Sequence, residues 1–228
     1  MSIAAHIEAI EERILKACLR SGRKREDITL MGVTKFQPAE TVNEAWNAGL
    51  RCFGESRVQE AAAKFESFRE GKPDMELHLI GALQRNKAKH AALFFDCIQS
   101  VDRQTLAEEL AKHAAGRRYP LPVLLEFRTG EDSKSGFTGT DELFKTAELI
   151  LDCPSLRIRG LMTIAPNTSE DKVLRAAFRR MVKLRQELEQ RFPSGNCLSM
   201  GMSGDFETAV EEGSTLLRIG AAIFGERN

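Results

Sequence analysis

The sequence lacks an excess of either charge, because 33 lysines and arginines balance 33 aspartates and glutamates over 228 residues. Proteins that bind nucleic acid or an anionic membrane through their overall field carry an excess of basic residues, so we expect neither partner. No apolar run reaches the length that a bilayer-spanning helix needs. The N-terminal stretch has acidic residues early and a helical apolar rhythm, unlike a signal peptide, and we expect a cytoplasmic protein.

Paired cysteines are missing as well. The five cysteines form no CxxC pair and have no histidine at metal-ligand spacing, and the four histidines are equally dispersed. An odd number of scattered thiols is typical of a reducing compartment, where cysteine acts as a small apolar side chain. The sequence therefore predicts no metal site, and buried structural cysteines at Cys18, Cys52, Cys97, Cys153 and Cys197.

What the sequence does contain is an alternation of short apolar strands and amphipathic helices. Apolar residues at every third or fourth position from Ile3 to Cys18 predict an N-terminal helix. After it, eight apolar runs predict strands at 29–35, 50–55, 75–82, 95–102, 121–129, 156–165, 196–202 and 215–225. Helices are predicted between them at 38–49, 57–68, 84–94, 103–115, 140–153, 170–192 and 205–213. Most of the strands lack polar alternation, as buried parallel strands do.

Parallel strands that alternate with helices form either an open doubly wound sheet or a closed barrel. An open sheet usually carries a GxGxxG stretch after its first strand, and the sequence has none. Eight strand–helix units in a chain of this length favour the barrel. We therefore predict one α/β domain over residues 1–228, a single (β/α)8 TIM-type barrel with an extra N-terminal helix. Because no apolar surface stripe is evident, we expect a monomer.

Active sites of such barrels lie at the C-terminal ends of the strands, which makes polar residues there candidates. Lys35 ends the first strand, in the stretch "MGVTKFQPAE". Because the first strand neighbours the eighth in a closed barrel, we expect Lys35 and Arg218 at the same part of the mouth. Further candidates follow other strands: Glu55, Ser56, Gly81 to Gln84, Asn86, Met162, Thr163, Gly220 and Ala221.

Two glycine-containing segments predict a phosphate site. They are "MGMSGD" (200–205) after the seventh strand and "RIGAA" in the eighth, and barrel phosphate sites commonly form from these two loops. Gly201, Gly204 and Gly220 permit close backbone approach, and the Ser203 hydroxyl can form a hydrogen bond. The glycines of either segment alone fit an ordinary turn equally well. Because such segments occur at both expected loops, a phosphate site is the favoured interpretation.

Lys35 would point into the barrel mouth beside this phosphate site. A partly desolvated lysine can form a Schiff base with a carbonyl, and a lysine, a phosphate site and Arg218 between them match what pyridoxal 5′-phosphate (PLP) needs. An arginine at the pyridine nitrogen would leave that nitrogen unprotonated and weaken the ring as an electron sink. Periodicity alone favours a different interpretation, a strand-end lysine in a surface salt bridge.

Nearly end to end, the sequence resembles the pyridoxal-phosphate homeostasis protein family, single-domain relatives of the alanine racemase barrel. The matching segments are "GVTKFQP", "FGESRVQEA", "HLIGALQRNKAK", "SVDR", "KSGF", "GLMTI" and "LSMGMSGDFETAVEEGSTLLRIGAAIFGER". Their order and spacing together are highly specific, although each segment alone is a weak signal.

The resemblance implies a type III PLP barrel in which Lys35 forms the internal aldimine and Arg218 sits at the pyridine nitrogen. It implies that the phosphate is bound by Ser203, Gly204, Gly220 and Ala221. Further residues in matching segments that line the mouth are Ser56, His78, Asn86 and Met162, and Lys134 is implicated in release or a second binding position. Departures from the family's usual pattern, which bear on the cofactor face, occur at Ser56, Leu77 and Phe127.

The resemblance also implies a function: a protein that holds PLP and hands it on, with PLP-dependent apo-enzymes as candidate recipients. It would take part in intracellular PLP (vitamin B6) homeostasis without efficient catalysis. An alternative is a PLP-dependent amino-acid racemase or decarboxylase. Racemases of this barrel family use a lysine and a tyrosine from a second domain, whereas the single tyrosine here, Tyr119, precedes the fifth strand. A less favoured alternative is a Schiff-base aldolase acting on sugar phosphates.

Overall fold

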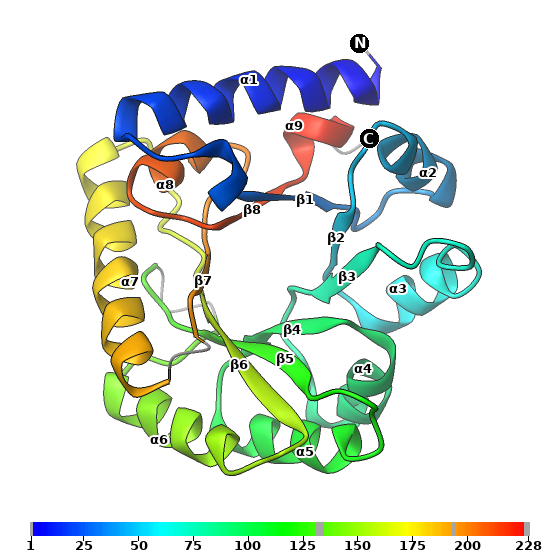
Figure 1. The fold of residues 1–228 in the computed structure, drawn as a ribbon, viewed down its shortest axis with the longest axis vertical. Helices are drawn as coiled ribbons and strands as arrows, with labels where there is room; N and C mark the ends of the chain where they lie inside the picture. Colours follow the sequence, from blue (N-terminus) through cyan, green and yellow to red (C-terminus); the bar gives the residue numbers. More distant parts are fainter. Residues whose placement is uncertain (1, 131–134, 193–194, 226–228) are drawn as a thin grey trace.

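Eight parallel strands close into a barrel in the order β1-β2-β3-β4-β5-β6-β7-β8 (Figure 1). The computed structural model describes residues 2–130, 135–192 and 195–225. The strands are β1 Thr29–Val33, β2 Cys52–Glu55, β3 Glu76–Leu79, β4 Cys97–Val101, β5 Leu121–Glu126, β6 Leu156–Met162, β7 Cys197–Ser199 and β8 Leu216–Ile219. Residues 29–32 pair with residues 216–219 and close the barrel. The predicted (β/α)8 barrel is confirmed.

Helices follow the strands around the outside of the barrel (Figure 1). They are α1 Ile3–Ser21, α2 Ala39–Asn47, α3 Val58–Phe65, α4 Ala88–Phe94, α5 Gln104–Ala114, α6 Thr140–Leu151, α7 Asp171–Arg191, α8 Phe206–Glu211 and α9 Ala221–Phe224, with short 3₁₀ turns η1 Arg25–Asp27 and η2 Arg85–Lys87. The predicted extra helix is α1. The Ser2 hydroxyl caps its start by accepting from the Ala5 N–H, and Gly22 ends it in a left-handed conformation. No helix of the described residues is long and apolar enough to cross a membrane.

The apolar core has two layers, as expected where strand side chains point alternately into the barrel and towards the helices. The larger layer lies between barrel and helices and includes Phe53, Phe65 and Phe178. A smaller layer fills the barrel itself, with members Met31, Cys52, Cys97, Leu124, Met162, Cys197 and Leu216. The strands therefore bury both of their faces, which explains why they read as continuous apolar runs.

The predicted eighth strand, 215–225, is wrong in its second half. β8 ends at Ile219, and Gly220, with φ −110° and ψ −82°, leads into the short helix α9. A short apolar run such as "IGAAIF" fits a strand and a helix equally well by periodicity. The consequence for the site is that the end of β8 offers the first backbone N–H groups of a helix rather than a continuing strand.

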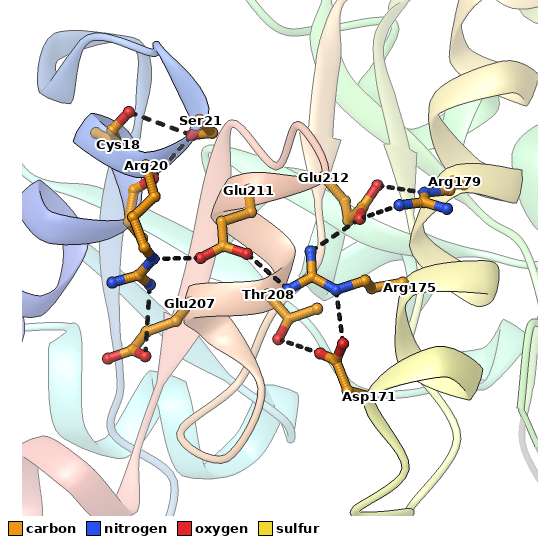
Figure 2. A network of polar contacts seen from close by, with 11 residues as sticks. Cys18, Arg20, Ser21, Asp171, Arg175, Arg179, Glu207, Thr208, Glu211 and Glu212 are labelled. Carbon is orange, nitrogen blue, oxygen red and sulfur yellow. Dashed lines mark hydrogen bonds and ion pairs between the residues drawn. The ribbon is translucent and has the colours of Figure 1, made fainter.

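A network of ion pairs holds α8 between α1 and α7 (Figure 2). Arg20 of α1 pairs with Glu211 (Nε to Oε1, 2.6 Å), and Arg175 of α7 pairs with Glu211 (2.7 Å) and Glu212 (3.0 Å). Hydrogen bonds to Asp171, Glu211 and Glu212 raise the pKa of Arg175. The hydrogen bonds from Arg175 help to lower the pKa values of Glu211 and Glu212 against the effect of their burial. The network thereby fixes the helix that follows the loop 200–205.

Candidate functional site

Lys35 lies in a tight turn directly after β1. The Gln37 N–H donates to the Thr34 carbonyl at 2.9 Å, which closes the turn. Met31 belongs to the layer inside the barrel, so strand alternation places Val33, the last residue of β1, on the inward face. Lys35 follows it by two residues. Phe36 has φ +65°, a left-handed conformation that is strained for residues other than glycine and asparagine.

A buried polar cluster from β2 and α3 fixes the backbone on both sides of Lys35. Lys64 Nζ donates to the Thr34 carbonyl and to Glu55 Oε1, both at 2.7 Å, and the Thr34 hydroxyl donates to the same carboxylate oxygen at 2.7 Å. The Phe36 N–H donates to Glu60 Oε1. Burial raises the pKa of Glu55, and Lys64 and Thr34 oppose that rise. We call Thr34, Glu55, Glu60 and Lys64 the Lys64 cluster; the sequence indicated Glu55 only as a strand-end candidate.

The two predicted phosphate loops meet at the ends of β7 and β8. Ser203 Oγ accepts a hydrogen bond from the Ala222 N–H of α9 at 3.3 Å, and the Arg218 N–H donates to the Gly201 carbonyl at 2.9 Å. Gly201 has φ +96°, and a Cβ there would lie 2.7 Å from the Cβ of Ala209. Only glycine therefore lets the loop pass this close to α8.

Three backbone donors of these loops form a cradle. In the described part of the chain no oxygen accepts a hydrogen bond from the N–H groups of Ser203, Gly204 or Ala221. A Cβ at Gly204 would meet no atom within 4 Å, so nothing crowds the approach. Converging N–H groups of this kind form an anion-binding concavity, and the donor set fits a phosphate group. Gly220 lies beside Val33. Val33 precedes Lys35 by two residues, so the cradle lies near the turn that carries this lysine.

Arg218 is the buried cation of the site. Its Nη1 donates to Ser199 Oγ at 2.6 Å and its Nη2 to the Thr163 carbonyl at 2.7 Å. Burial lowers its pKa to about 10, against the opposing fields of Asp205 and Glu126. The guanidinium therefore remains protonated at neutral pH and can only donate hydrogen bonds.

Glu126 is a functional candidate that sequence reasoning missed. It ends β5, is 3 % exposed, and accepts from the Ser135 hydroxyl at 2.9 Å through Oε1. Its Oε2 is buried and has no hydrogen-bond partner in the described part of the chain. Burial raises its pKa to about 6, with Asp102 adding to the rise and Arg218 opposing it. The signal in the sequence was a lone acid at the end of the apolar run "PVLLE".

Other predicted residues differ in burial. His78 is fully buried inside the barrel, where it bonds Gln99 and Glu76. Met162 ends β6 beside Glu126 and belongs to the inner apolar layer, and the contact of both residues with the cofactor stays a prediction. Ser56 is half-buried against the backbone of Gly81, and Asn86 is exposed in η2.

Two departures from the family pattern lie in the layer outside the barrel. Leu77 and Phe127, two departures from the family pattern, are fully buried in the layer between barrel and helices. They therefore do not face the cofactor side of the barrel. Lys134 lies outside the described residues.

Comparison with known proteins identifies the family of the chain. The family alanine racemase, N-terminal domain, matches residues 6–228. Pyridoxal phosphate homeostasis proteins of Vibrio cholerae and Aquifex aeolicus are 44 % and 39 % identical over 100 % of this chain and cover 97 % and 99 % of their own length. The chain belongs to the pyridoxal phosphate homeostasis protein family. The resemblance predicted from the sequence motifs is confirmed.

Solved structures place the family within a wider fold group. PipY of Synechococcus elongatus, solved with PLP bound, is 37 % identical, with a TM-score of 0.81 over 95 % of this chain and 100 % of that one. Alanine racemase of E. faecalis is 16 % identical, with a TM-score of 0.70 over 59 % of the enzyme. At that identity the racemase shares the fold of this family and no more can be read from it.

Proposed function

We propose that this protein binds PLP and takes part in PLP homeostasis, holding the cofactor rather than catalysing a reaction with it. The observation that carries the proposal is the cradle of N–H groups from Ser203, Gly204 and Ala221, which have no acceptor among the described residues. The cradle follows β7 and β8, and β8 pairs with β1, the strand before Lys35. The binding of PLP by the related PipY supports it.

In the proposed site each residue has a separate task. The cradle would hold the phosphate, Arg218 would donate to the ring nitrogen, and Lys35 would supply the amine that reacts with the aldehyde. Bound in this way, PLP supplies an electron-withdrawing ring. Arg218 can only donate, so it keeps the pyridine nitrogen unprotonated and the ring a weak electron sink. The site thus favours retention of the cofactor over carbanion chemistry, and apo-enzymes that need PLP are the proposed recipients.

The position of Tyr119 supports a role other than racemisation. Two-base racemisation needs a second proton-transfer group opposite the lysine. Tyr119 is the single tyrosine of the sequence, is 67 % exposed, and precedes β5. It therefore lies at the N-terminal ends of the strands, whereas Lys35 lies at their C-terminal ends.

A comparison of PLP with pyridoxal, which lacks the phosphate, tests the proposal. We expect PLP to bind much more tightly than pyridoxal when a visible absorbance band is followed during titration, because only PLP can use the cradle. A Ser203→Ala variant should lose part of that difference. Equal binding of the two compounds, or no binding of either, would contradict the proposed site.

Glu126 favours one second candidate function, an amino-acid racemase or decarboxylase. A buried acid with a pKa of about 6 suits general acid–base catalysis near neutral pH. Exchange of amino-acid Cα hydrogen for deuterium by the loaded protein, abolished in Glu126→Gln, would move the assignment to this enzyme class. We expect no such exchange.

A further inference from the structure

A chain of hydrogen bonds crosses the inside of the barrel, starting at Arg218. Its Nη1 donates to Ser199 Oγ (2.6 Å), and Ser199 Oγ bonds Gln99 Oε1 (2.7 Å). Gln99 Nε2 bonds His78 Nδ1 (2.7 Å), and His78 Nε2 bonds Glu76 Oε2 (3.0 Å). These residues come from β8, β7, β4 and β3, and Ser199, Gln99 and His78 are fully buried.

The two ends of this chain fix the direction of every bond in it. At one end Arg218 can only donate, so Ser199 accepts from it. The Gln99 amide lies with Oε1 on Ser199 and Nε2 on His78. The Ser199 hydroxyl therefore donates to Oε1, and the Gln99 Nε2–H donates to His78 Nδ1, which accepts. At the other end, Arg159 Nη1 donates to Glu76 Oε2 at 3.0 Å, and a carboxylate paired with an arginine is an ionised acceptor.

Both ends therefore place the single imidazole proton on Nε2. From the arginine end, Nδ1 accepts; from the glutamate end, Nε2 donates. The two deductions are independent and agree. Burial lowers the pKa of His78, which is consistent with a neutral ring between an amide and a carboxylate.

We infer that Gln99 and His78 are positioning residues that hold the Arg218 guanidinium in one orientation, with His78 as the neutral Nε2–H tautomer. Because each link accepts on one side and donates on the other, a break anywhere along the chain removes a partner from a buried group. The orientation of Arg218 thus depends on residues that lie beneath the cofactor site.

The same assignment argues against a metal at this place. Cys52, Glu76 and His78 bring possible ligand atoms within 4.8 Å of one another, and His78 Nε2 lies 3.9 Å from Cys52 Sγ. With the proton on Nε2, however, that nitrogen has no lone pair to offer a metal ion. Arg159, which donates to Glu76 at 3.0 Å, adds a repelling positive charge.

Nitrogen-15 NMR of the cofactor-free protein tests the inference directly. The imidazole nitrogen shifts distinguish the two tautomers and the imidazolium, and the His78 signals are identified by their loss in His78→Gln. We expect neutral Nε2–H at pH 7, with no change when zinc is added. The Nδ1–H tautomer, an imidazolium, or a zinc-dependent shift of His78 would overturn it.

Gln99→Glu provides a second readout of the direction of bonding. A carboxylate at position 99 still accepts from Ser199, but it cannot donate to His78. The ring would then lie between two carboxylates, and we expect both of its nitrogens to carry protons. A neutral Nε2–H ring in this variant would contradict the inference, and if the variant does not fold, the wild-type spectrum decides.

The consequence for the cofactor is tested separately and rests on the proposed function. Gln99→Met removes the acceptor of Ser199, whereas Gln99→Glu keeps it. In Gln99→Met we expect about tenfold weaker PLP binding, because about one net hydrogen bond is lost, and a shifted absorbance band. In Gln99→Glu both the affinity and the band should be largely restored. Thr146→Val, which removes a buried hydroxyl on α6, is the control and should bind normally. Equal binding by Gln99→Met and the control would overturn the positioning role, while failure of the wild type to bind PLP would overturn the proposed function and leave the tautomer result standing.

Discussion

The buried ion pair of Lys64 and Glu55 controls how Lys35 is presented. The two side chains are 8 % and 0 % exposed and 2.7 Å apart. Removing one partner of a buried pair leaves an uncompensated charge, so Lys64→Met should lower the free energy of unfolding by about 3–5 kcal/mol. Urea unfolding measures it. Lys16→Met breaks an exposed pair with Glu12 and should cost about 0.5 kcal/mol or less; equal effects of the two variants would contradict the assigned role.

Glu126 makes stability depend on pH in a defined direction. Its pKa is about 6 in the folded chain against 4.5 ordinarily, so between these values the folded state binds more protons than the unfolded state. The free energy of unfolding therefore falls as the pH rises through this window and stays lower above it. Glu126→Gln removes this titration and should be on the order of 2 kcal/mol more stable than wild type at pH 7. The difference should vanish below pH 4.5 in urea unfolding, and a difference independent of pH would contradict the assignment.

At the scale of elements, the turn 34–37 stores strain beside the site. Phe36 is 55 % exposed and has φ +65°, which costs an L-residue roughly 1–2 kcal/mol. Phe36→Gly and Phe36→Ala both remove the ring, but only glycine relieves the strain. We therefore expect Phe36→Gly to be more stable than Phe36→Ala by about 1 kcal/mol. The comparison is made by thermal or urea unfolding, and equal stabilities would show that the turn relaxes in the variants.

The elements also show where sequence reasoning ends. The strands before Lys35 and before Ser203 were predicted because an apolar run followed by polar or glycine-rich residues marks a strand end in a barrel. The end of β8 could not be predicted, since the apolar residues after Gly220 fit a strand and a helix equally well. The contacts on the inner face of β4 could not be predicted either, because Gln99 stands in a buried strand and nothing in the local sequence identifies its partners.

At the scale of the whole molecule, closure of the barrel was predictable and the chemistry inside it was not. Eight strand–helix units without a GxGxxG stretch are a property of the entire chain and are visible in the sequence. The bond between Ser199 and Gln99 joins residues 100 positions apart. Its existence depends on the register of strands that are not neighbours, and periodicity carries no information about that register. The register of β3 and β4 likewise hid the bond between Gln99 and His78.

The most direct test of the central claim is borohydride reduction of the PLP-treated protein followed by mass mapping of its peptides. Reduction makes a Schiff base permanent, so the label marks the lysine that held the cofactor. We predict a single pyridoxyl label on the peptide containing Lys35, and loss of that label and of the visible absorbance band in Lys35→Ala. A label on another lysine, or a protein that stays colourless and unlabelled, would contradict the assignment of Lys35 and of the PLP site.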